Sequence, residues 1–500
     1  MQLNNKNNYL LMNKDNIVAS FKRTENTFGD DIIYEIINCS KSKLPIGFMD
    51  ITTWIDGRKA SKHNSHLKEI MERLECADSE GFIRVTHATS INDTFWVKRE
   101  DETVSWNDIS LYCNEFTESI SALALEGVGL YNEPFSSTGL PEFVSDGSFP
   151  KCFKKEKDGI YIYKGGARGA SNVGLEPYSE VLAAEIATHL TDNAISYKLA
   201  KLHGRLASKC KLFTNEKYGY VPFRRLAEQG KVVTLDAAFR YFENIGSEKT
   251  FREMLLIDAL TFNTDRHTGN YGVLFNNNTL DVIKMAPVFD LNLSLFPYWV
   301  NEDFKTPGDN ILKYGPALGN DFTRLGQQSF IPEFSDKLRD FCDWQFSFKG
   351  NNTFSNDRVK YLEEIVSKQA KAILSKEKLQ TKNVFIPETA DKVKIAVKDM
   401  TEEMEKFAEK IEDLNLPILI SFDADSHRAV VLVEPENPKP CDFLFEFDFL
   451  ADENRIYINF NKISVEDLAN YNLHAYNIFN KINDIFTEME LEQIENEERE

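Results

Sequence analysis

The sequence predicts an α+β chain that has a two-lobed central region, an N-terminal α+β region and a small α/β appendage near the C-terminal end. Five hundred residues correspond to about three domains of ordinary size. The composition, 42% hydrophobic and 27% charged, is that of a chain able to bury a large core. The character of the sequence changes at a Gly/Pro/Ser-rich segment near residues 127–139 and again past Lys382, so we expect domain boundaries there.

The predicted domains follow these changes. We expect an N-terminal α+β region at residues 1–135, a two-lobed domain at 140–382, an α/β appendage at 388–490 and an acidic tail at 491–500. Within the two-lobed domain, the first lobe is expected at about 140–228 and the second at about 229–382. The tail is dense in glutamate, which predicts a frayed or disordered end.

Charge and cysteine usage exclude several classes of protein. The formal net charge of −21 argues against a broad DNA-binding surface, so we expect no direct binding of nucleic acid. No apolar run approaches the ~18 residues of a membrane span, and the N-terminus lacks the apolar core of a signal peptide. The seven cysteines are scattered and never in C-x-x-C spacing. These features predict a cytoplasmic protein with reduced thiols, no membrane contact and no zinc site.

The N-terminal region is expected to mix strands and helices. Short apolar clusters between polar breaks predict a β meander over residues 1–35. Apolar residues at helical spacing predict helices over residues 52–74 and 107–126. Residues 82–98 are rich in aromatic and β-branched residues, which predicts strand, turn and strand.

The first lobe contains a lysine placed to meet phosphates. A hairpin signal at residues 158–159 precedes a short apolar strand that ends at Lys164, with two glycines behind it. A strand-end ammonium can reach nucleotide phosphates, and its charge then needs a carboxylate from a neighbouring helix. Glu180, in a helix predicted over 177–190, is the natural partner, and Glu185 on another face of that helix is the competitor. The alternative is that Lys164 is an ordinary surface residue.

Two further strands, expected at residues 208–213 and 220–223, complete the first lobe. The second leads into Arg224, Arg225 and a loop, which suits a crossover between two lobes where adenine binds.

The stretch from Ile257 to Phe296 carries the strongest chemical signal. An apolar run ends in the polar segment NTDRHTGN, a short strand and a turn follow, and a second apolar segment ends at Asp290. Asp265, Asn270 and Asp290 therefore lie at the ends of apolar elements, where a hairpin can direct their oxygens into one cleft. Phosphoryl transfer needs a carboxylate that accepts the hydroxyl proton and oxygen ligands for magnesium, and D-x-x-x-x-N with a later Asp meets that need in protein kinases. The alternative is a polar turn between two buried strands.

The remaining elements show less chemistry. Residues 303–328 are rich in Gly, Pro and Asn and predict loops, and helices are expected at 333–346 and 357–374. The appendage is expected to hold a charged helix over 391–414, four strands and a last helix over 465–489. No residue pattern in the appendage indicates a reaction. It is interpreted either as a partner-binding module or as a structural extension.

In their order and spacing these segments resemble the HipA-like serine/threonine protein kinases of bacteria. Within about residues 145–375 the resemblance is carried by IYIYKGG, EPYSEVLAAEIA, SKCKLFT, NTDRHTGNYGVLF and APVFDLNLSLF, and THATSINDTFWVK resembles the leader region of long-form members. The resemblance implies a two-lobed, protein-kinase-like fold and transfer of the ATP γ-phosphate to a protein hydroxyl with Mg²⁺. It implies Asp265 as the catalytic base, Asn270 and Asp290 as magnesium ligands, and Lys164, paired with Glu180, as the lysine that contacts the ATP phosphates.

The resemblance also implies a phosphate-binding loop and a set of partners. Gly147 and Ser148 would lie in that loop, where some family members phosphorylate their own serine. The family's partners include antitoxins and some members arrest growth, so a protein substrate and an antitoxin-like partner are the candidate partners here.

Three departures keep alternatives open. The loop DGSFPK has a single glycine, the appendage is no part of the family's core, and Leu291-Asn292 follows Asp290 where D-F-G would be expected. Because D-R-H-x-x-N has the same spacing in phosphatidylinositol kinases, a lipid kinase is one alternative. A non-catalytic, kinase-like scaffold is the other.

Overall fold

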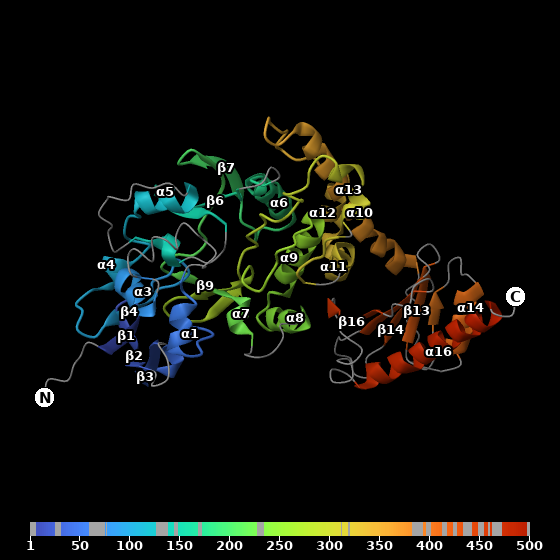
Figure 1. Ribbon diagram of the computed structural model, residues 1–500, viewed down its shortest axis with the longest axis horizontal. Coiled ribbons are helices and arrows are strands. Elements are labelled where there is room, and N and C mark those ends of the chain that lie inside the picture. Colours follow the sequence, from blue (N-terminus) through green and yellow to red (C-terminus); the bar gives the residue numbers. More distant parts are fainter. Residues whose placement is uncertain are drawn as a thin grey trace. The chain divides into compact units, whose positions relative to one another are not determined.

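The computed structural model divides the chain into two compact units. One comprises Met1–Val233, Arg240–Ala317 and Ser329–Ala372, and the other comprises Thr234–Phe239, Leu318–Gln328 and Ile373–Glu500. The structure describes residues 7–25, 32–59, 76, 78–126, 139–144, 149–168, 173–227, 235–311, 313–318 and 321–382, and separate elements between 394 and 497. Gly147, Ser148 and most of the predicted linker lie outside the described residues. The first unit combines helices with antiparallel sheets, as expected for the predicted α+β class (Figure 1).

The N-terminal region is built on an antiparallel four-stranded sheet in the order β3-β2-β1-β4, which confirms the predicted meander. Its strands and helices are β1 (Asn8–Asn13), β2 (Asn16–Glu25), β3 (Ile32–Cys39), α1 (Ile51–Asp56), α3 (Ser79–Thr86), β4 (Phe95–Arg99), α4 (Trp106–Ile109) and α5 (Glu118–Glu126). The helix predicted over 52–74 is described only in its first part, as α1, and most of its remaining residues lie outside the described ranges.

Two predictions for this region were wrong in part. Residues 82–86 belong to helix α3 and not to a strand, because Asp78 caps the helix by accepting a hydrogen bond from the Gly81 N–H at 2.6 Å and the apolar side chains Phe82 and Ile83 are buried on one side. The single helix expected over 107–126 is two helices, α4 and α5. Ser105 and the α4 residue Asp108 form a capping box that starts the short first one.

The N-terminal region and the first lobe share one hydrophobic core. Phe21 of β2, Trp54 of α1 and Phe95 of β4 belong to the same buried cluster as Phe143 and Phe153. Each of these side chains is at most 5% exposed, so the cluster excludes water throughout. The first lobe therefore packs against the N-terminal region and does not have a separate core.

The first lobe is an antiparallel sheet in the order β5-β6-β8-β7 with one long helix. Its elements are β5 (Lys151–Glu156), β6 (Gly159–Gly165), α6 (Glu176–Leu190), β7 (Tyr197–Leu202) and β8 (Arg205–Lys211). The strand ending near Lys164 and the helix over 177–190 are thus confirmed. Helix α6 begins with Pro177 in its first turn and buries Leu182, Ala183 and Ile186.

The second lobe is mainly helical and carries the sheet β11-β10-β9. Along residues 218–382 the elements are β9 (Tyr218–Pro222), α7 (Phe223–Leu226), α8 (Leu235–Asn244), α9 (Glu248–Thr261), β10 (Gly272–Asn276), β11 (Val282–Met285), α10 (Pro307–Ile311), α11 (Phe322–Ser329), α12 (Ser335–Asp340) and α13 (Asn356–Lys382), of which α11 and the ends of α8 and α13 fall largely in the second unit. The hairpin predicted after the NTDRHTGN segment is β10–β11. From Met254 to Leu260 every residue of α9 is buried, so this helix is the core of the lobe.

The C-terminal part forms a six-stranded sheet in the order β12-β13-β14-β15-β16-β17 with two helices. Its elements are β12 (Lys394–Ala396), α14 (Glu402–Glu412), β13 (Ile418–Asp423), β14 (Arg428–Val433), β15 (Phe443–Asp448), β16 (Arg455–Ile458), β17 (Asn461–Lys462) and α16 (Leu473–Glu497). Phe407 of α14 and Phe479 of α16 pack on Phe445 and Phe447 in a core of its own. The helix predicted over 391–414 is shorter than expected because residues 394–396 pair with β13 as a strand.

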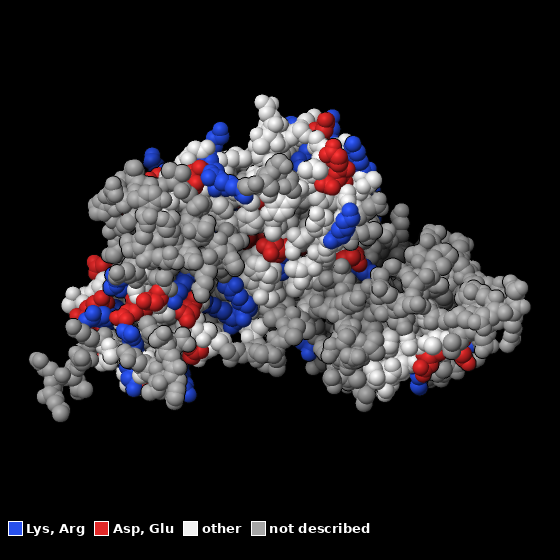
Figure 2. All heavy atoms as spheres, viewed as in Figure 1, with Lys and Arg blue, Asp and Glu red and all other residues white. Residues whose placement is uncertain are grey.

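Surface charge is mixed on the face shown in Figure 2, where acidic and basic side chains of the described residues lie beside one another. None of the helices that the structure describes combines the length and hydrophobicity of a membrane span. The six described cysteines are all free thiols, as the sequence predicts.

Candidate active site

A row of polar side chains crosses the sheet of the first lobe. The strand register places Lys164 of β6 opposite Lys151 of β5 on one side and opposite Ser208 of β8 on the other. Directly paired residues project from the same face of a sheet, so these three side chains face the same way. Two lysines opposite each other repel unless anions lie between or beside them. The row is therefore suited to negatively charged groups.

Lys164 meets two carboxylates. Its Nζ lies 2.7 Å from Oε1 of Glu180, on α6, and 2.6 Å from Oδ1 of Asp290, which follows β11. Glu180 is completely buried, and Ser208 donates a hydrogen bond to its other oxygen. The competitor Glu185 instead accepts hydrogen bonds from the backbone and side chain of Ser347, at 2.8 and 2.7 Å. Glu180 is the partner of Lys164.

The pKa values in this cluster follow from burial and charge. Burial alone would lower the pKa of Lys164, but Asp290 and Glu180 raise it overall, so the ammonium is charged. Burial alone would raise the pKa of Asp290, yet the contact with Lys164 lowers it and keeps the carboxylate ionised. Burial raises the pKa of Glu180, and Lys164 and Ser208 oppose that shift by donating hydrogen bonds.

The loop between α9 and β10 presents Asp265 and Asn270. Helix α9 ends at Phe262, whose φ of 54° turns the chain sharply out of the helix. Asn263 Oδ1 accepts the Asp265 N–H at 3.1 Å, and the Asn270 side-chain amide donates to the Asp265 carbonyl at 2.9 Å. Since the side-chain N–H group of Asn270 donates to the backbone, the side-chain oxygen of Asn270 is left to bind another group. Both residues line the cavity described below.

Arg266 ties this loop to the rest of the site. Its guanidinium, 1% exposed, donates to both carboxylate oxygens of Asp258 on α9, each at 2.9 Å. It also donates to the carbonyls of Asn270 and Phe289, each at 2.8 Å. One buried side chain thus fixes the backbone beside Asn270 and the backbone just before Asp290.

The carboxylate of Asp265 makes no hydrogen bond to any residue that the structure describes. Burial raises its pKa, and the negative charge of Asp290 acts in the same direction, while His267 opposes it. A partly buried carboxylate with a raised pKa and an open side toward a cavity has the properties of a general base.

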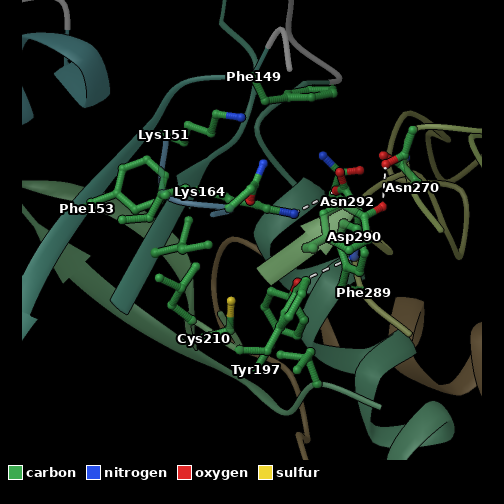
Figure 3. A pocket seen from close by; sticks show the side chains of 18 of the residues that line it. Phe149, Lys151, Phe153, Lys164, Tyr197, Cys210, Asn270, Phe289, Asp290 and Asn292 are labelled. Atoms are coloured by element: carbon green, nitrogen blue, oxygen red, sulfur yellow. Dashed lines mark hydrogen bonds and ion pairs between the residues drawn. The ribbon is translucent and has the colours of Figure 1, made fainter. Parts of the chain in front are cut away.

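A cavity of about 430 Å³ lies between these elements, with Lys164, Asp265, Asn270 and Asp290 on its wall (Figure 3). Its volume is within the range of small-molecule sites. Next to the polar groups the wall is aromatic, because Phe213, Tyr220 and Phe289 pack with ring centroids 5.3–5.6 Å apart. An aromatic, apolar wall next to cations and carboxylates suits a nucleotide, whose base is apolar on its faces and whose phosphates are charged.

The N-terminal region also reaches the cavity. Ile91 and Asn92 line it, and the carbonyl of Asn92 accepts the Tyr220 N–H at 2.8 Å. Thr214 donates to the Ile91 carbonyl at 2.6 Å. These bonds connect the N-terminal region to the crossover between the lobes. No local pattern in the sequence predicts these bonds.

The structure therefore brings together five of the seven predicted site residues: Lys164, Glu180, Asp265, Asn270 and Asp290. Gly147 and Ser148 lie outside the described residues. The sequence did not single out four further residues near them. Lys151, Ser208, Arg266 and Asn292 contact or adjoin the set.

The donor set fits one kind of metal. Among the described residues no three His, Cys, Asp or Glu side chains cluster as a metal site, so a metal held here would need amide oxygens besides one or two carboxylates. Asp290 Oδ2 and Asn270 Oδ1 make no hydrogen bond to the described residues. Few carboxylates combined with amide oxygens suit magnesium that is held jointly with substrate phosphates, and they do not suit zinc.

Comparison with known proteins gives one sequence relative. The chain is 28% identical over 133 residues to the serine/threonine-protein kinase CtkA of Helicobacter pylori, a match that covers 24% of this chain and 41% of CtkA. The match thus spans about two fifths of that relative's length. No protein-family model matches the chain.

Two solved structures are similar in part. The proinflammatory kinase CtkA of Helicobacter pylori has a TM-score of 0.37 and 17% identity, with 47% of this chain and 93% of that chain covered. A chain of the Shewanella oneidensis complex of the toxin–antitoxin proteins HipA and HipB with operator DNA has a TM-score of 0.43 and 11% identity, with 75% and 100% covered. The sequence match to CtkA supports the resemblance to bacterial serine/threonine protein kinases.

Proposed function

We propose that this chain is an ATP- and Mg²⁺-dependent kinase that transfers the γ-phosphoryl group to a serine or threonine hydroxyl of a protein. One observation carries the proposal. Lys164 joins Glu180 of the first lobe to Asp290 of the second, on the wall of the cavity that also contains Asp265 and Asn270. Phosphoryl transfer requires cations on the phosphates and a carboxylate at the acceptor hydroxyl, and both are present in one cavity.

In this mechanism the chain's own residues do four things. Lys164, held by Glu180, offsets the charge of the nucleotide phosphates, and Lys151 adds a second cation on the same row of the sheet. The ionised Asp265 accepts the proton of the attacking hydroxyl. Arg266 holds the backbone at Asn270 and Phe289 so that the oxygens of Asn270 and Asp290 keep their positions. Bound Mg²⁺, held by Asn270 and Asp290, would neutralise charge on the phosphates.

Nucleotide binding separates this proposal from a non-catalytic scaffold. A non-hydrolysable ATP analogue should raise the thermal unfolding temperature of the wild type, and Mg²⁺ should increase the shift, because a ligand that binds the folded state stabilises it. A protein that shows no shift with the analogue, with or without Mg²⁺, would be a scaffold.

Transfer of labelled phosphate identifies the class of acceptor. Incubation with γ-labelled ATP and either a mixed protein substrate or phosphatidylinositol vesicles should label serine or threonine in protein and leave the lipid unlabelled. Label in the lipid alone would instead favour the phosphatidylinositol-kinase alternative.

Two finer features of the proposal rest on the family resemblance. We include autophosphorylation at Ser148 and an antitoxin-like protein partner, by analogy with the neighbour HipA, which was solved with HipB and DNA. Mass spectrometry after incubation with ATP tests the first, since an unmodified Ser148 removes it. Co-purification of the tagged chain from its native cell tests the second, and the absence of a stoichiometric protein partner would contradict it.

A further inference from the structure

Asn292 is a buried amide at the polar end of the cavity. It is 5% exposed, it lines the cavity, and it makes no hydrogen bond to any residue within the described ranges. Figure 3 shows it on the same side of the cavity as Asp290 and Asn270. Buried amides are usually hydrogen-bonded to protein, whereas the polar atoms of Asn292 are not fully enclosed and open toward the cavity. The position of this amide therefore calls for a functional explanation.

The backbone around Asn292 is fixed from both sides. Asp290 has a φ of 58°, in the left-handed region that few residues other than Gly, Asn and Asp adopt. The Ser294 N–H donates to the Leu291 carbonyl at 3.1 Å, which closes a tight turn over Asn292, and the Leu295 N–H donates to the Thr261 carbonyl at 2.7 Å. The turn is anchored to α9, so the backbone that carries the amide is held in place.

We propose that Asn292 supplies a third protein oxygen to the divalent cation of the bound nucleotide, beside Asp290 and Asn270. The inference rests on the proposed function, which it deepens by naming a further metal-binding residue. The sequence departs from the kinase pattern at this point. Leu291-Asn292 follows Asp290, where the D-F-G pattern has Phe-Gly after its aspartate. With Asn292, the candidate donor set is one carboxylate and two amides, all oxygen donors of the kind that magnesium prefers.

The oxygen of the Asn292 amide, and not its N–H group, is the atom that would add to this site. Lys151 and Lys164 already provide cationic donors for phosphate oxygens along one row of the sheet. Protein oxygens are scarcer, because one oxygen of Asp290 is engaged with Lys164 at 2.6 Å. A third oxygen two residues beyond Asp290 completes the set without adding negative charge.

The test measures metal affinity in the complex of the full chain with a non-hydrolysable ATP analogue, with Mn²⁺ as the probe and its free electron-paramagnetic-resonance signal as the readout. Asn292→Leu keeps the size and removes the oxygen, so it should weaken Mn²⁺ about tenfold or more, as loss of a metal-site partner does. Asn292→Asp keeps an oxygen in the same place and should bind Mn²⁺ at least as tightly as the wild type. Asn278→Leu, at an exposed position on the β10–β11 turn, is the matched control and should leave the affinity unchanged.

Each other outcome overturns the assignment. Equal Mn²⁺ affinity in the wild type and in Asn292→Leu would remove Asn292 from the metal site while leaving the proposed function intact. Weaker binding of the metal-free analogue by Asn292→Leu, which removes the amide N–H without adding charge, would show that this N–H contacts phosphate instead. If the wild type binds neither analogue nor Mn²⁺ with it, the proposed function fails and this inference fails with it. Because Asn292→Asp retains polarity, it also serves if Asn292→Leu does not fold.

Discussion

Arg266 and Asp258 form a buried, two-pronged ion pair between the end of α9 and the loop that carries Asp265. Both side chains are 1% exposed. The remaining guanidinium nitrogen of Arg266, Nη1, donates to the carbonyls of Asn270 and Phe289. The pair therefore connects the core helix of the second lobe to the backbone at both candidate metal ligands.

Removing either partner should be costly, because the other charge stays buried. Asp258→Leu and Arg266→Met should each lower the free energy of unfolding by about 3–5 kcal/mol. The double variant should lose less than the sum of the two, since neither charge is then left alone. Urea unfolding of the four proteins measures this coupling. Strictly additive losses would show that the two side chains do not stabilise each other.

The pairing of Lys164 with Glu180 predicts a difference between two glutamates of one helix. Glu180→Gln removes the charge that holds Lys164, and misplacing a group on the phosphates by about 1 Å can lower kcat/KM about a hundredfold. Glu185→Gln makes the same change on an exposed face and should leave kcat/KM for ATP unchanged. Thermal unfolding of both variants checks that they are folded. An equal effect at the two positions would contradict the assignment of Glu180.

Glu142 predicts a dependence of stability on pH. Burial raises its pKa to about 7, although the Phe153 N–H donates to it at 3.1 Å. Because the folded state holds the proton more tightly, the contribution of Glu142 is fully present below about pH 4.5 and is lost as pH rises through about 7, a loss of roughly 3 kcal/mol.

The matched variant for this prediction is Glu142→Gln, which keeps the acceptor and cannot ionise. It should be more stable than the wild type at pH 8, and the advantage should shrink toward pH 5. Urea unfolding at both values measures the difference. A constant difference between the two proteins across this range would mean that Glu142 does not titrate on unfolding.

Local signals were sufficient to single out three of the candidate site residues that the structure brings together. Lys164, Asp265 and Asp290 each follow an apolar element, so the pattern that predicts the element also predicts where its polar end lies. The sequence favours Glu180 over Glu185 because the two lie on different faces of one helix, and the packing of α6 against the sheet decides between them.

Other features depend on contacts between distant segments. In the sequence, Arg266 is one residue of a predicted polar turn. Its role follows only from its hydrogen bonds to Asp258 and to the Phe289 carbonyl. Asn92 lies at the cavity because its backbone carbonyl accepts a hydrogen bond from the Tyr220 N–H. No local sequence pattern predicts this bond. The segment near Phe82 was assigned to a strand because its residues favour strands, whereas the Asp78 cap and burial on one side make it helical.

The most direct test of the account is transfer of γ-labelled phosphate to protein by the wild type and by Asp265→Asn. The substitution keeps the shape of the side chain but removes the carboxylate that accepts the hydroxyl proton. We predict Mg²⁺-dependent labelling of serine or threonine by the wild type and a loss of at least about a hundredfold in Asp265→Asn, with the analogue still bound. Labelling by Asp265→Asn at the wild-type rate would contradict the central claim that Asp265 is the base of a kinase.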